Sequence, residues 1–100
     1  MQNNIVKLLL EIEKRPMMYI GHNSIFCLKA FLDGWHFRNP KHTENSEILI
    51  EFTDWIQENY HIDRYSISWD KLLFLLYQDE EIALNNFFLN FNQFLREKNQ

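Results

Sequence analysis

Glycine and proline are scarce in this sequence. Its 100 residues include only two of each. A β-sandwich or β-barrel joins many short strands through turns, and such turns are rich in glycine and proline. The scarcity of both residues therefore argues against an all-β fold and favours helices.

Disulfides, a secretory signal and a membrane span are also missing. The chain has one cysteine, Cys27, which cannot form an internal disulfide. Its first residues lack the basic and then apolar pattern of a secretory signal. Its unbroken apolar runs are only a few residues long, much shorter than a membrane-spanning helix requires. We therefore expect a reducing, cytoplasmic setting and no membrane partner.

Positive charge is in short supply. Lysine and arginine number 10 against 14 aspartates and glutamates, and the formal net charge is −4 with the four histidines neutral. Nucleic-acid binding needs a basic surface that can neutralise phosphates. An acidic protein instead attracts basic proteins. The balance therefore predicts a basic protein partner and no nucleic acid.

Apolar residues are plentiful by comparison. They make up 46% of the chain, and aromatic residues alone make up 16%. This composition is typical of a folded interior, and 100 residues are enough for one domain. We predict an all-α fold, a compact bundle of about five helices in a single domain that spans residues 1–100.

Apolar residues recur at helical spacing in five segments. In the first segment they stand at positions 5, 8, 9 and 12, with charged residues between them. Ser24, Ser68 and Asp79 are suitable N-caps, and Thr43 or Ser46 could begin the helix between the loops. The predicted helices span residues 4–14, 24–37, 46–60, 69–77 and 80–97.

Pro16 separates the first two predicted helices, because proline lacks an amide hydrogen and excludes the preceding residue from the helical region. The apolar run at residues 17–20 is too short for a helix of its own, and we expect it to be a buried connector. Gly34 lies inside the next predicted helix, where we expect another backbone to come close. Ile82 and Leu89 lie opposite the apolar face of the last helix, which is therefore either clasped on two sides or in contact with a partner.

The segment from residue 43 to 63 contains six acidic residues and no lysine or arginine. Its acids step by three, four, three and four residues, which places them along one edge of a helix roughly 80° wide. The residues of this edge are Glu44, Glu47, Glu51, Asp54 and Glu58. Charged edges are usually solvated faces. Because no basic residue relieves the repulsion here, the edge is also a candidate surface for a basic partner.

No group of residues predicts catalysis. Cys27 borders an apolar stripe, where a structural thiol is far commoner than a nucleophile. The histidines at 22, 36, 42 and 61 share no metal-ligand spacing. We therefore expect a protein that is not an enzyme, with no catalytic residue, no metal and no cofactor.

Several motifs in order along nearly the whole chain resemble those of a family of small bacterial proteins. The residues that carry the resemblance are Lys14-Arg15-Pro16, Met18-Tyr19-Ile20-Gly21, Ser24-Ile25, Leu28, Phe31-Leu32, Gly34, Ser68-Trp69-Asp70-Lys71-Leu72, Phe87-Phe88 and Phe94. Some members of that family are immunity proteins of contact-dependent growth inhibition systems. The resemblance implies a helical, cytoplasmic protein that neutralises one cognate toxin domain, often a ribonuclease and here one of the small, basic, pancreatic-ribonuclease-like type.

The contact residues of the family cannot be transferred, because each immunity protein matches its own toxin. From the residues alone, Glu47, Glu51, Asp54 and Glu58 are the expected toxin-binding residues. They would block the active-site or substrate-binding cleft of a basic nuclease. The alternative is a helical adaptor or regulatory domain that binds a basic protein or a small ligand.

Overall fold

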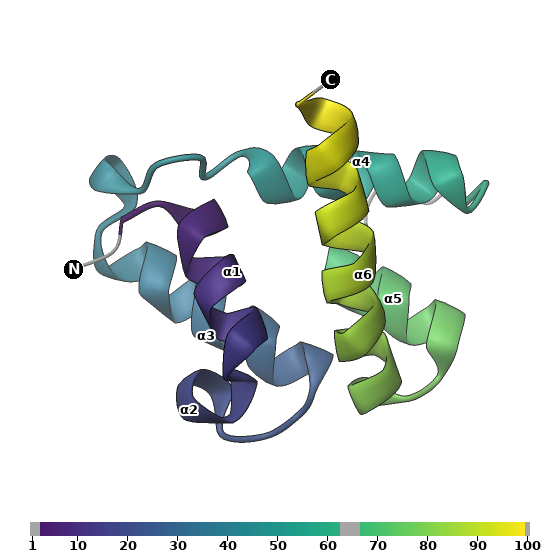
Figure 1. Cartoon of the computed structure of the whole chain (residues 1–100), viewed down its shortest axis with the longest axis horizontal. Coiled ribbons are helices and arrows are strands. Elements are labelled where there is room, and N and C mark those ends of the chain that lie inside the picture. Colours follow the sequence, from purple (N-terminus) through teal and green to yellow (C-terminus); the bar gives the residue numbers. More distant parts are fainter. Residues whose placement is uncertain (1–2, 63–66, 100) are drawn as a thin grey trace.

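The structure is a computed structural model that describes residues 3–62 and 67–99. Within these residues the chain forms six α-helices and one short 3-10 helix, and no strand (Figure 1). The elements in chain order are α1 Ile5–Lys14, α2 Pro16–Ile20, α3 Ile25–Arg38, η1 Pro40–His42, α4 Ile48–Asn59, α5 Trp69–Tyr77 and α6 Glu80–Lys98. The all-α prediction is confirmed, and its five helices correspond to α1, α3, α4, α5 and α6. The radius of gyration is 13.0 Å, which is about the value for a compact chain of this length.

Helix α6 is the centre of the bundle. It packs against α3, α4 and α5, and Figure 1 shows it upright where it crosses α4. Phe52 of α4 lies at this crossing, fully buried. Its ring centroid is 5.3 Å from that of Phe87, 5.2 Å from that of Phe91 and 5.5 Å from that of Phe94. The aromatic residues that dominate the composition therefore form the contact between α4 and α6.

Helix α1 forms from the periodicity seen in the sequence. Asn4 caps it, accepting hydrogen bonds from the backbone amides of Val6 and Lys7 through its side chain. The apolar positions face inward and are all buried, namely Ile5, Leu8, Leu9 and Ile12. The backbone at the start of this helix also pairs with Glu44, whose carbonyl accepts from the Ile5 amide at 3.1 Å. The start of α1 is thereby fixed to the connection that leads into α4.

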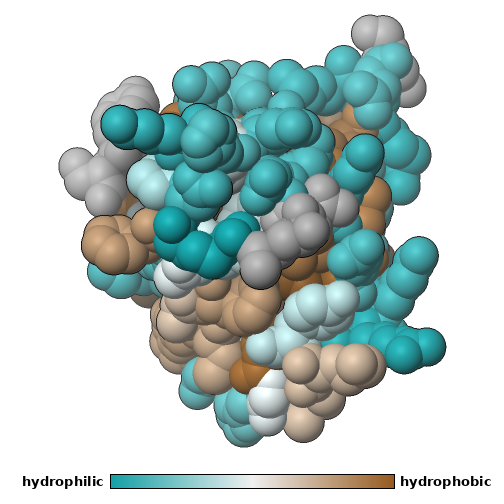
Figure 2. All heavy atoms as spheres, turned by 90° about the vertical axis from the view of Figure 1, so that its left-hand side faces the viewer, coloured by the Kyte–Doolittle hydropathy of each residue, from teal (hydrophilic) through white to brown (hydrophobic). Residues whose placement is uncertain are grey.

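The segment after Pro16 differs from the prediction. It forms the short helix α2, with proline at its first position, where the missing amide hydrogen costs nothing. Met17 and Met18 are 55% and 72% exposed, and Tyr19 is only half-buried against the ring of Phe31. Figure 2 shows the side of the molecule that lies on the left in Figure 1, and apolar surface is gathered in the lower part of this view. The expectation of a buried connector was wrong, because successive residues of a helix turn by about 100° and cannot all face the bundle.

The predicted caps have mixed outcomes. Ser24 and Asp79 cap α3 and α6 with their side chains, as predicted. Ser68 occupies the N-cap position of α5, but its hydroxyl donates to the Asp70 carboxylate instead of accepting from the helix. Neither predicted residue begins α4, because Glu47 stands at its N-cap without a side-chain bond. Cap identity depends on which partner a side chain finds in space, which spacing alone does not reveal.

One other expectation is corrected by packing. A Cβ placed on Gly34 would meet nothing within 4 Å, so no backbone approaches this glycine. Helix α5 is buried on one side and leaves Leu75 at 47% exposure on the other. None of the helices in the described part of the chain combines the length and the apolar character of a membrane span.

Candidate functional site

The acidic edge begins with a turn rather than with a helix. Asn45 has a positive φ of 60°, and its carbonyl accepts from the Ile48 amide at 3.1 Å. The chain therefore enters α4 only at Ile48, three residues later than Asn45. Glu44 lies before this turn, held by its backbone bonds to the start of α1, and is separated from the helical residues. The acids on or next to α4 are the other four.

We call Glu47, Glu51, Asp54 and Glu58 the acidic row. All four side chains are exposed, whereas Ile48, Phe52 and Ile56 on the opposite side of the helix are buried. The buried side fixes the rotation of α4 about its own axis, and this rotation keeps the acidic row on the surface. The structure thus places all four predicted site residues along one exposed face.

The repulsion within the row is relieved at one position. Lys98 of α6 places its Nζ 3.0 Å from Oε1 of Glu51, and both side chains are about half exposed. No sequence pattern predicts this contact, because the two residues lie on different helices and meet only where α6 crosses α4. Asp54 and Glu58 have no hydrogen-bond or ion-pair partner for their carboxylates within residues 3–62 and 67–99.

The helix dipole adds to the asymmetry of the row. Glu51 lies in the first turn of α4, where a negative charge is stabilised. Glu58 lies in the last turn, where a negative charge is destabilised and where α4 itself has no basic residue. The helix dipole therefore does not account for a glutamate at this position.

An apolar side chain borders the acidic row. Ile50 is 66% exposed, and Asp54 follows it by one helical turn. Protein interfaces combine a desolvated apolar centre with a charged rim. The outer face of α4 has both components, and the sequence analysis identified only the charged one.

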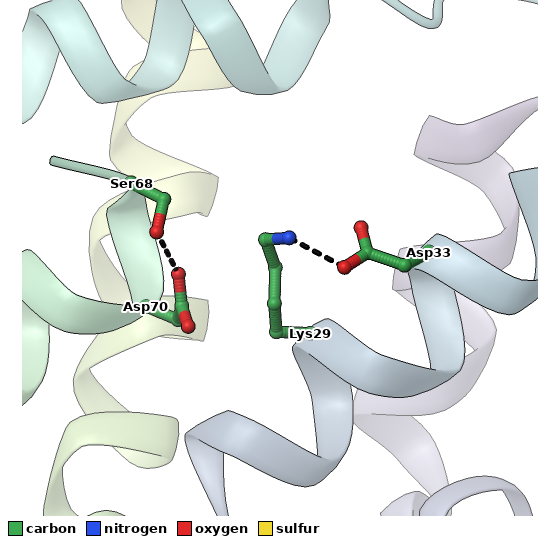
Figure 3. A network of polar contacts seen from close by, with 4 residues as sticks. All are labelled: Lys29, Asp33, Ser68 and Asp70. Atoms are coloured by element: carbon green, nitrogen blue, oxygen red, sulfur yellow. Dashed lines mark hydrogen bonds and ion pairs between the residues drawn. The ribbon is translucent and has the colours of Figure 1, made fainter. Parts of the chain in front are cut away.

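Polar side chains at the contact between α3 and α5 are paired with each other. Figure 3 shows Lys29 and Asp33 of α3 facing the start of α5, with the Lys29 Nζ 2.5 Å from Oδ2 of Asp33. On α5, the buried carboxylate of Asp70 accepts a hydrogen bond from the Ser68 hydroxyl. The Ser68 hydroxyl thus gives the buried Asp70 carboxylate a hydrogen-bond partner, and the nearby Lys29 and Asp33 form an exposed ion pair within α3.

A network of hydroxyl groups joins α4 to α5 and α6. The hydroxyl oxygens of Tyr60 and Tyr77 are 2.8 Å apart, and the Tyr60 hydroxyl donates to Oδ1 of Asn90 at 3.2 Å. Burial, followed by the hydrogen bond to Tyr60, raises the pKa of Tyr77 to about 12. Tyr77 therefore remains neutral far above physiological pH, which suits a structural hydroxyl.

The residues considered for catalysis remain dispersed. Cys27 is half-buried on α3, and no three His, Cys, Asp or Glu residues in the described segments are grouped as metal ligands. Comparisons with models of protein families, with curated proteins and with solved structures find no match. The exposed surfaces of this chain are therefore the features that bear on its function.

Proposed function

We propose that this protein is an immunity protein that binds and neutralises a cognate toxin domain of a contact-dependent growth inhibition system. One observation carries the proposal, namely the row of exposed carboxylates on or next to α4, whose mutual repulsion is relieved within residues 3–62 and 67–99 at Glu51 alone. The resemblance of the motifs to that family supplies the class of partner. The acidic row supplies a surface for a basic one.

The mechanism requires only binding. A ribonuclease holds its substrate with lysine and arginine side chains that contact phosphates. Carboxylates spaced along one helix can pair with those same cations and thereby occupy the path of the RNA backbone. Inhibition follows because the substrate can no longer reach the active site, and the immunity protein itself performs no chemistry.

The expected energies differ along the row. Pairs that stay at the solvated rim contribute about 0.2 to 1 kcal/mol each. A hydrogen-bonded pair that is fully desolvated in the complex costs about 2 to 5 kcal/mol when one partner is truncated. Asp54 stands beside the exposed Ile50, so it is the carboxylate of the row that an apolar contact at Ile50 would most directly shield from water.

The test uses charge reversal at the two carboxylates that have no partner within the described chain. The variant combines Asp54→Lys with Glu58→Lys, and its partner is the toxin domain encoded beside the gene for this protein. We expect association to slow by at least about tenfold at low salt and the difference to shrink at high salt, because steering by charge is screened. Stopped-flow association rates across a salt series and inhibition of toxin activity give the readouts.

The matched control combines Glu11→Lys with Asp33→Lys, which changes the net charge equally on other helices. It is expected to retain most of the wild-type rate. If the α4 variant and the control behave alike, the acidic row is a solvated face. A genomic neighbourhood without a toxin gene would instead favour the adaptor that binds a different basic protein.

A further inference from the structure

The exposed face of α6 is apolar, whereas that of α4 is acidic. Leu89 and Ile82, seven residues apart, are 68% and 48% exposed. From Ile82 to Leu95 the helix contains no ionisable side chain, although it contains four asparagines and one glutamine. Surface helices usually have charged residues on their outer side, whereas the centres of protein interfaces are depleted of them.

A groove lies beside this face, between α6 and the junction of α1 with α2. It has a volume of about 390 Å³, and its lining combines apolar with polar side chains, namely Pro16, Leu84, Phe88 and Leu89 with Glu13, Asn23 and Asn85. Figure 1 shows α1 and α6 on the near side of the molecule, and the Asn92 amide connects them by donating to the Glu13 carboxylate at 3.1 Å. Leu89 is thus both an exposed apolar side chain and part of the wall of a groove that is apolar in part.

Charge is arranged along α6 so that the helix complements itself when reversed. Its first turn is acidic, with Glu80 and Glu81, and its last turn is basic, with Arg96 and Lys98. Glu80 accepts a hydrogen bond from Ser24, and Lys98 pairs with Glu51, but Glu81 and Arg96 have no side-chain partner within the described residues. Arg96 follows Leu89 by seven residues and therefore lies on the same side of the helix.

We propose that this face of α6 binds a second copy of the same chain in an antiparallel, two-fold symmetric dimer. An axis near Leu89 brings Arg96 of each copy to the first turn of the other, where Glu81 lies, and aligns opposite ends of the two helix dipoles. Leu89 of each copy then fills the groove of its partner. Two chains of charge −4 can approach through this uncharged face, whereas the acidic row would repel a copy of itself.

The proposed dimer is independent of the proposed function. Symmetric contact through α6 leaves the outer face of α4 accessible, so each copy retains one acidic row. Its test requires no toxin, and its failure would leave the acidic row unaffected.

The first test is the molar mass of the intact chain by sedimentation equilibrium from micromolar to millimolar concentration. We expect a monomer–dimer equilibrium, and Leu89→Glu is expected to raise the dimer dissociation constant at least about tenfold, because it places two carboxylates at the axis. The matched control is Ile50→Glu, at an equally exposed isoleucine of α4, which should leave the equilibrium unchanged. A wild-type chain that stays monomeric throughout, or a dimer weakened equally by both variants, overturns the proposal.

The second test concerns the direction of the pairing. Glu81→Arg and Arg96→Glu are each expected to weaken the dimer, and the double variant is expected to recover most of the loss, because the ion pair is then restored with reversed polarity. In a Cys27→Ser background, Leu89→Cys should form an intermolecular disulfide under copper phenanthroline and air, whereas Ile50→Cys should not. Absence of both the charge recovery and the selective disulfide would exclude the antiparallel arrangement.

Discussion

The outer faces of α4 and α6 differ sharply although the two helices share one core. Both helices contribute to the same aromatic cluster, α4 through Phe52 and α6 through Phe87 and Phe91. Away from that cluster, α4 presents four carboxylates, and the outer side of α6 presents aliphatic and amide side chains between its charged ends. Core packing constrains the inward residues alone. The outward residues are free to differ, and their difference underlies the two proposed contacts, one with a basic partner and one with a second copy of the chain.

The largest expected effect breaks the core that supports both faces. Phe52→Ala removes a fully buried ring at the crossing of α4 and α6 and should lower the free energy of unfolding by about 3 to 5 kcal/mol. Ile50→Ala, two residues away and 66% exposed, should change it by less than about 0.5 kcal/mol. Urea unfolding followed by circular dichroism measures both. Equal effects on the free energy of unfolding would contradict the rotation of α4 about its own axis that buries Phe52 and exposes Ile50.

A smaller effect concerns the hydrogen-bond network that joins the end of α4 to α5 and α6. Tyr77→Phe removes the hydroxyl that meets Tyr60 and should cost about 0.5 to 1.5 kcal/mol. Because folding raises the pKa of Tyr77 from 10.0 to about 12, the folded state retains this proton where the unfolded state loses it. The contribution of Tyr77 to stability is therefore complete below pH 10 and is lost as pH rises toward 12.

Urea unfolding at several pH values in this alkaline range gives the measurement. The wild-type chain should lose more stability with rising pH than the Tyr77→Phe variant, in which this group no longer titrates. Parallel losses in the two chains would place the alkaline sensitivity at another group.

A third prediction isolates Lys98, which among the described residues is the lysine paired with the acidic row. Lys98→Met breaks the ion pair with Glu51, and exposed pairs contribute about 0.2 to 1 kcal/mol. Freed of this competitor, Glu51 should bind a basic partner more readily, with association about twofold to fivefold faster at low salt. Lys71→Met removes the same charge from α5 without touching Glu51 and serves as the control. A faster rate in both variants would reflect net charge alone.

The smallest effect compares the carboxylates in the first and last turns of α4. Glu58→Gln removes a carboxylate from the last turn of α4 and should stabilise the fold by about 0.3 to 0.5 kcal/mol. Glu51→Gln removes one from the first turn together with its ion pair and should destabilise the fold by a similar amount. Thermal unfolding at low salt measures the difference, and high salt should reduce it. Shifts of the same sign would contradict the dipole argument.

The fold was largely predictable because helices with one apolar face record their period directly in the sequence. The helix predicted at residues 69–77 begins and ends at the same residues as α5 in the structure. Helix α2 was missed because five residues cannot form a stable helix alone, and its stability comes from contacts with α1 and α3. Its exposed methionines could not be foreseen without knowing which side those neighbours occupy.

The candidate surfaces were predictable only in part. The spacing of Glu51, Asp54 and Glu58 predicts a shared face from local geometry, and these residues do lie on one face of α4. The pairing of Glu51 with Lys98 joins residues 47 positions apart, so it depends on how α4 and α6 cross. The groove beside Leu89 likewise arises from the placement of α1 against α6, which no periodicity specifies.

The order in which a ribosome delivers these helices gives the position of α6 a further consequence. Five helices emerge before it, yet seven of the buried residues belong to α6. Until those residues leave the exit tunnel, α3 and α4 can contact α5, but all three helices lack the surface of α6 against which they pack. Nascent chains that stop short of α6 therefore expose aromatic side chains to chaperones and proteases, and the folded state forms only after α6 has been made.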